Sequence, residues 1–90
     1  MQPIQTQLET TLQEEATLTQ RIRLCRDFID ILLDYVAHNA DQIHILTAED
    51  ILTSVHTIAQ DLDTELLHVR LEKSILVNKL GEATSLTLSP

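Results

Sequence analysis

Apolar residues recur at alternating spacings of four and three in both halves of the chain, and this repeat constrains the fold most. Eight of ten seam positions in the first half and eight of nine in the second are apolar. The positions are Ile4, Leu8, Thr11, Glu15, Leu18, Ile22, Cys25, Ile29, Leu32 and Val36, then Leu52, Val55, Ala59, Leu62, Leu66, Val69, Lys73, Leu76 and Leu80. Such a repeat is typical of helices that pack along one stripe.

The charges of the two halves mirror each other about residue 44. The mirrored pairs of opposite sign are Glu15 with Lys73, Glu9 with Lys79, Arg23 with Glu65, and Arg26 with Asp61 or Asp63. An antiparallel helical hairpin brings such pairs together. We expect the pair of Glu15 and Lys73, which lies inside the seam, to fix the register because a charge pair there penalises other alignments. The other pairs are expected at the surface, where each contributes about 0–1 kcal/mol.

The chain has one Gly and two Pro, all near its ends, so it can form only a few long elements. The sequence predicts an all-α fold: a long, coiled-coil-like antiparallel two-helix hairpin. Its parts are a hairpin domain over 1–81, with helices over about 4–39 and 48–80 and a tip at 40–47, and a flexible tail over 82–90. Thr47 is expected to cap the second helix, and Gly81 is expected to end it.

A second apolar stripe runs beside each seam. It comprises Leu24, Phe28, Ile31 and Tyr35 in the first helix, and Ile51, Ile58, Leu67, Leu71 and Ile75 in the second. Two stripes are more than a two-helix seam requires, so we expect two hairpins to dimerise into a four-helix bundle. The predicted partner-binding residues are Leu24, Phe28, Ile31, Tyr35, Ile58, Leu67 and Leu71. A partner helix would use the same spacing as self-association, so both remain open.

The acidic composition excludes several classes of partner. The net charge is −8, with 14 acidic and 6 basic residues, so no basic face is expected for nucleic acid or for an anionic membrane. No apolar run approaches the roughly 18 residues of a transmembrane helix, and no secretory signal is visible. A single Cys cannot form an internal disulfide, which favours a cytoplasmic protein.

The residues that could perform chemistry form no recognisable set. None of His38, His44, His56 and His68 pairs at a spacing of four, so neither a metal site nor another cofactor is predicted. Cys25 lies in the seam, where a thiol is inert. One Gly cannot make a glycine-rich phosphate loop, and no acidic pair has a concave pocket to work in. The sequence therefore predicts a protein that is not an enzyme.

Two resemblances suggest functions. The segment from Val55 to Gln60 resembles the His-x-Leu-Lys-Gly core of histidine phosphotransfer domains, which implies an alternative signalling function with His56 as phosphate acceptor. Ala59 and Gln60 stand where that core has Lys and Gly. In size, acidity and helical character, the chain resembles the small helical chaperones and adaptors of type III secretion and flagellar export. That resemblance implies a partner helix held against the exposed stripe.

Overall fold

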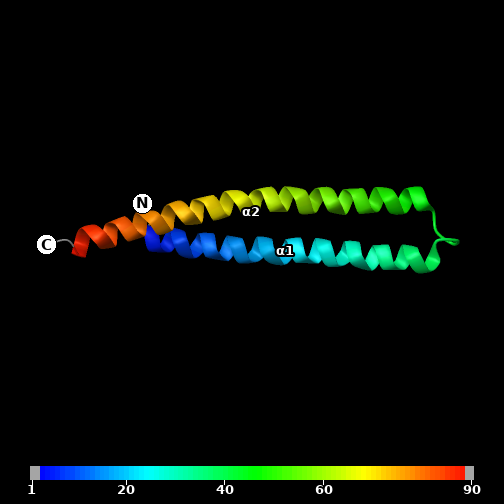
Figure 1. Cartoon of the computed structure of the whole chain (residues 1–90), viewed down its shortest axis with the longest axis horizontal. Coiled ribbons are helices and arrows are strands. Elements are labelled where there is room, and N and C mark those ends of the chain that lie inside the picture. Colours follow the sequence, from blue (N-terminus) through cyan, green and yellow to red (C-terminus); the bar gives the residue numbers. More distant parts are fainter. Residues whose placement is uncertain (1–2, 89–90) are drawn as a thin grey trace.

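The computed structural model describes residues 3–88, with side chains over 3–82. Two helices, α1 (Ile4–Asn39) and α2 (Ile45–Leu88), pack against each other in antiparallel directions, which confirms the predicted all-helical hairpin (Figure 1). The molecule is a narrow rod of 74 × 18 × 16 Å, and its two chain ends lie at the end opposite the turn.

The heptad seams form the interface between the two helices. Each of the 19 predicted seam residues is buried or half-buried. The core cluster consists of Leu18, Ile22, Leu62 and Leu66, with Cys25 and Val69 packed against it. Ile22 and Leu66 occupy mirrored positions, so the predicted register of the apolar residues is confirmed.

The turn is shorter than predicted, because α2 begins at Ile45 rather than at residue 48. The cap is His44 and not Thr47. The backbone N–H of Thr47 donates to Nδ1 of His44 over 3.1 Å, and the N–H of Ala48 donates to the His44 carbonyl over 3.1 Å. A side-chain acceptor two or three residues before a free N–H is what defines an N-cap. Since Nδ1 accepts this proton, a neutral His44 carries its own proton on Nε2.

The second helix also ends later than predicted. Gly81 does not adopt the left-handed conformation of a C-terminal cap, and α2 continues through it to Leu88. Residues 82–88 of the predicted tail are therefore helical, while 89–90 lie outside the described residues. No Pro or further Gly follows Gly81 until Pro90, so nothing in the local sequence forces the helix to stop.

We expect Gly81→Ala to stabilise the end of α2 by about 0.5–1 kcal/mol, because Gly is the poorer residue inside a helix. The added Cβ would meet no atom within 4 Å. Circular dichroism and amide exchange across residues 78–84 would measure the change. If Gly81 instead capped the helix, alanine would lower the helical content and speed exchange in this segment.

Candidate interaction surface

A part-buried ion-pair cluster sets the register of the hairpin. Nζ of Lys73 lies 2.9 Å from both carboxylate oxygens of Glu15, as the mirrored charges predicted. Nε of Arg70 also donates to Glu15, over 3.2 Å. Arg70 was not predicted as a partner, although it lies one helical turn before Lys73. The Glu15 side chain is only 19% exposed, so two cations surround one carboxylate within the seam.

These contacts lower the pKa of Glu15 from its ordinary value of 4.5. The hydrogen bond from Lys73 is the largest cause; desolvation opposes the shift, and Arg70 adds to it. A lowered pKa stabilises the folded state above the unfolded pKa, and this contribution is lost as the pH falls through the folded pKa.

We therefore expect Glu15→Gln to destabilise the hairpin at neutral pH, with a difference from wild type that shrinks as the pH falls below about 4.5. Urea unfolding from pH 7 to pH 2.5 would measure it. Glu9→Gln is the matched control, because Glu9 is exposed and forms no such cluster. A penalty for Glu15→Gln that did not change with pH would contradict the assignment.

The remaining mirrored charge pairs divide into one that forms and two that do not. Nη2 of Arg26 lies 3.3 Å from Oδ2 of Asp63, which is the partner rather than Asp61. Within residues 3–82, the pairs of Glu9 with Lys79 and Arg23 with Glu65 do not come within ion-pair distance, so these predictions were wrong.

Helical handedness explains the difference. Arg26 and Asp63 each follow a seam residue by four positions, which places both on one flank of an antiparallel pair. Arg23 follows the seam residue Ile22, whereas Glu65 precedes the seam residue Leu66. At about 100° per residue, these steps turn the two side chains to opposite flanks.

All seven predicted partner-binding residues are exposed, at between 47% for Phe28 and 70% for Leu24. Five of them lie on one side of the hairpin, together with Ile51. We call this set the apolar face; its members are Leu24, Phe28, Ile31 and Tyr35 on α1, and Ile51 and Ile58 on α2. The four residues of α1 follow one another at spacings of four, three and four, so they share one helical face.

The two helices meet on this side near the turn. Tyr35 of α1 and Ile51 of α2 line the same small pocket beside the turn. Phe28 and Ile58 each lie one heptad further from the turn than Tyr35 and Ile51, so they occupy equivalent positions along the face.

The structure does not bring Leu67 and Leu71 into the apolar face. They follow the seam residue Leu66 by one and five positions, which turns them about 100° and 140° from Leu66 and away from the flank that carries Ile58. They are exposed on the outer surface of α2. The sequence analysis placed them in one set with Ile58. Spacing along a single helix does not show which of its sides faces the neighbouring helix, so this difference could not be seen from the sequence.

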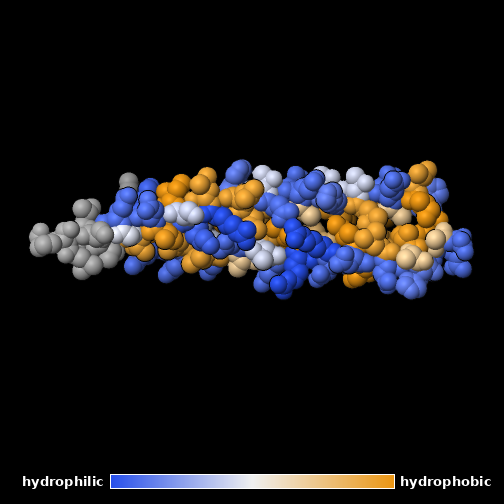
Figure 2. Space-filling view, viewed as in Figure 1, coloured by the Kyte–Doolittle hydropathy of each residue, from blue (hydrophilic) through white to orange (hydrophobic). Residues whose placement is uncertain are grey.

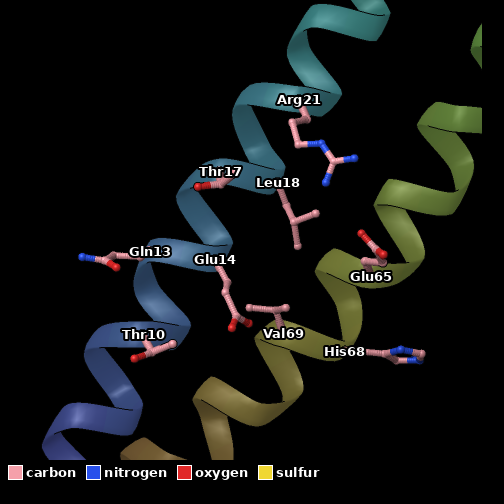
Figure 3. A pocket seen from close by; sticks show the side chains of 9 residues that line it. All are labelled: Thr10, Gln13, Glu14, Thr17, Leu18, Arg21, Glu65, His68 and Val69. Atoms are coloured by element: carbon pink, nitrogen blue, oxygen red, sulfur yellow. The ribbon is translucent and has the colours of Figure 1, made fainter.

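Toward the chain ends, the same side of the hairpin becomes polar. An open groove of about 600 Å³ is lined by Thr10, Gln13, Glu14, Thr17, Leu18, Arg21, Glu65, His68 and Val69. Figure 3 shows Glu14 and Arg21 of α1 and Glu65 of α2 pointing into the space between the helices, whereas Gln13 and His68 point away. Arg21 lies one heptad before Phe28, so the groove continues the apolar face.

Apolar side chains are also visible on the face drawn in Figure 2, in one area near the turn and another toward the chain ends, separated by strongly hydrophilic residues. The largest apolar residues exposed outside the apolar face, Leu67 and Leu71 apart, are Leu12, Leu33, Ile45, Leu46, Ile75 and Val77. The apolar face contains four exposed apolar side chains in succession on α1, whereas on α2 the exposed Ser54 lies between Ile51 and Ile58.

The side chains over 3–82 bring together no three His, Cys, Asp or Glu residues that could hold a metal ion. Cys25 is a free, half-buried thiol of the seam. His56 is exposed, and its neighbour Ala59 is buried against α1.

In the part of the chain that the structure describes, neither helix has a stretch long and apolar enough to cross a membrane. No protein-family model matches the chain, and no curated protein and no solved structure is significantly similar to it.

Proposed function

We propose that this protein is a non-enzymatic protein–protein interaction module, a helical adaptor, scaffold or small chaperone that works by covering its apolar face with another helical surface. Self-association into a four-helix bundle is the first expected use of the face. The observation that carries the proposal is the group of six exposed apolar side chains on one side of the hairpin.

The surface of the isolated hairpin supports association. Its accessible surface is 7036 Å², whereas a compact protein of 10.2 kDa exposes about 5,300 Å². The excess of about 1,700 Å² on one chain is larger than the area of about 800 Å² that each partner buries in a standard specific interface. A rod of two helices has a large surface for its volume. Packing against a second pair of helices would cover part of that surface.

The energetics favour association of modest strength. Covering a half-exposed Leu, Ile or Phe side chain stabilises by about 1 kcal/mol. Six such residues on each of two copies contribute on the order of 10 kcal/mol, which is similar to the cost of association of about 4–15 kcal/mol. The exposed face therefore favours an assembly that can exchange one helical partner for another.

A different protein would use the same face. An amphipathic helix binds a groove through apolar residues at spacings of three and four, which is how the apolar face itself is built. Partner binding and self-association therefore compete, and a partner of this kind would convert the dimer into a mixed assembly.

Light scattering on the full chain across a range of concentrations tests the proposal. We expect a mass near twice the 10.2 kDa of one chain at high concentration, falling toward 10.2 kDa on dilution. A folded chain that stayed monomeric up to about 1 mM, where association would be weaker than about −4 kcal/mol, would contradict it.

A further inference from the structure

We infer that the occupant of the apolar face is a second copy of this chain turned end for end, so that only the halves nearest the turn overlap. The inference rests on the proposed self-association and adds its orientation, its register and the charged residues that set them. It is drawn from the order of apolar and charged layers along the face.

Residues that flank the seam at intervals of seven form successive layers across this side of the hairpin. From the turn toward the chain ends, the layers are Tyr35 with Ile51, Phe28 with Ile58, Arg21 with Glu65, and Glu14 with Glu72. The first two layers are apolar, the third contains one charge of each sign, and the fourth contains two acids. All eight side chains are exposed.

A dimer with both turns at the same end would place identical layers together. Over the full length of the hairpins, Glu14 and Glu72 from both copies would then form one layer of four carboxylates. Like charges held together in an interface repel one another and are costly to desolvate. Each copy also carries a net charge of −8, so the rest of the surface supplies no excess of cations to neutralise them.

The reversed arrangement avoids this layer. A two-fold axis between the two apolar layers, close to Ile31 of α1 and Ser54 of α2, places the Tyr35 layer of each copy on the Phe28 layer of the other. Every member of the apolar face then lies within the overlap, and Glu14 and Glu72 remain outside it in water.

The polar groups at the edges of the overlap are complementary. Counting equal numbers of residues from the axis places Arg21 level with residue 42 in the turn of the second copy, next to Asp41, and Glu65 level with His44 there. Asp41 and His44 are exposed, and the ion pairs among the side chains of residues 3–82 use neither Arg21 nor Glu65. The overlap therefore ends at two contacts that favour the reversed register.

Electron-spin distance measurements on a single label test the orientation. The exposed Thr10 is replaced by Cys in a Cys25→Ala background and carries the nitroxide. The reversed dimer places the two labels about 65 Å apart, since each lies about 21 residues from the axis at 1.5 Å per residue. A dimer with both turns together would place them within about 25 Å, since packed helices are about 8–10 Å apart.

A label distance within about 25 Å would overturn the inferred orientation and leave the proposed self-association standing. A monomeric mass for this labelled variant and for wild type at high concentration would overturn both. A distance near 65 Å together with a dimeric mass supports the inference.

Charge reversal tests the register independently. We expect Arg21→Glu to weaken the dimer about tenfold, and Asp41→Arg in the same chain to restore it, because the two residues meet across the interface. The matched alternative is Glu65→Arg in the Arg21→Glu chain. It would restore a dimer with both turns at the same end, because residues 21 and 65 of different copies meet in that orientation. Rescue by Glu65→Arg alone, or equal dissociation constants for all variants, would overturn the register.

Discussion

Replacing Leu66 with alanine is expected to lower the free energy of unfolding by about 2–5 kcal/mol. The side chain is 7% exposed and belongs to the core cluster with Leu18, Ile22 and Leu62. Truncation removes buried methyl groups and leaves a cavity between the two helices. Urea unfolding followed by circular dichroism would measure the loss.

The effect is large relative to the stability of the hairpin because its core is small. Among the residues whose side chains the structure describes, seven hydrophobic side chains are buried: Leu18, Ile22, Ala48, Ala59, Leu62, Leu66 and Leu76. Small domains are stable by about 5–15 kcal/mol, so one core leucine can account for a large share.

Leu67→Ala is the matched control, because it makes the same change at the next residue. Leu67 is 66% exposed and lies outside both the seam and the apolar face. Its replacement should change stability by less than about 0.5 kcal/mol. Equal effects of the two substitutions would mean that the seam assignment is wrong.

Replacing Ile31 with aspartate is expected to weaken self-association by about 100-fold or more, with little effect on the fold of one hairpin. Ile31 is 66% exposed in the single chain and lies at the centre of the apolar face. A charge placed there must lose water on association, and the two-fold axis would bring two such charges together. Sedimentation equilibrium would measure the dissociation constant, and circular dichroism would confirm that the helices persist.

Leu33→Asp is the control for this prediction. Leu33 is 50% exposed on the same helix, two residues away, and therefore turned by roughly 160°. It makes the same chemical change outside the apolar face, so the dissociation constant should stay within about threefold of wild type. If both aspartates weakened association equally, the surface that associates would not be the apolar face.

The register of the hairpin could be predicted from the sequence because it depends on two strong and local signals. The heptad spacing identifies the residues that must leave water, and the lone charges Glu15 and Lys73 within it can be accommodated only beside each other. The structure agrees with both signals: the seam residues are buried or half-buried, and Lys73 donates to both oxygens of Glu15.

The ends of the helices were harder to predict because they depend on weaker local preferences. Thr47 is a better N-cap by type than His44, but the imidazole Nδ1 of His44 is the group that accepts the free N–H. Gly81 ends a helix only when it turns left-handed, and here it remains helical.

The sequence also did not show on which side of the rod each exposed side chain lies. Positions that sum to 88 identify residues at the same height along the rod, but not on the same side of it. The sequence thus predicted a pair of Arg23 with Glu65 that helical handedness forbids, and it grouped Leu67 with Ile58 although they lie on different sides of α2. Only three-dimensional placement separates the apolar face from the outer surface of α2.

The central claim is that the chain doubles back at residues 40–44 and that its halves pair in this one register. Spin labels on Thr10→Cys and Asn78→Cys in one Cys25→Ala chain, diluted with unlabelled wild type, test it most directly. Both sites are exposed and lie at mirrored positions. The hairpin predicts a distance of about 20 Å or less between labels on neighbouring helices. A continuous helix would place the two sites about 100 Å apart, and that result would contradict the account.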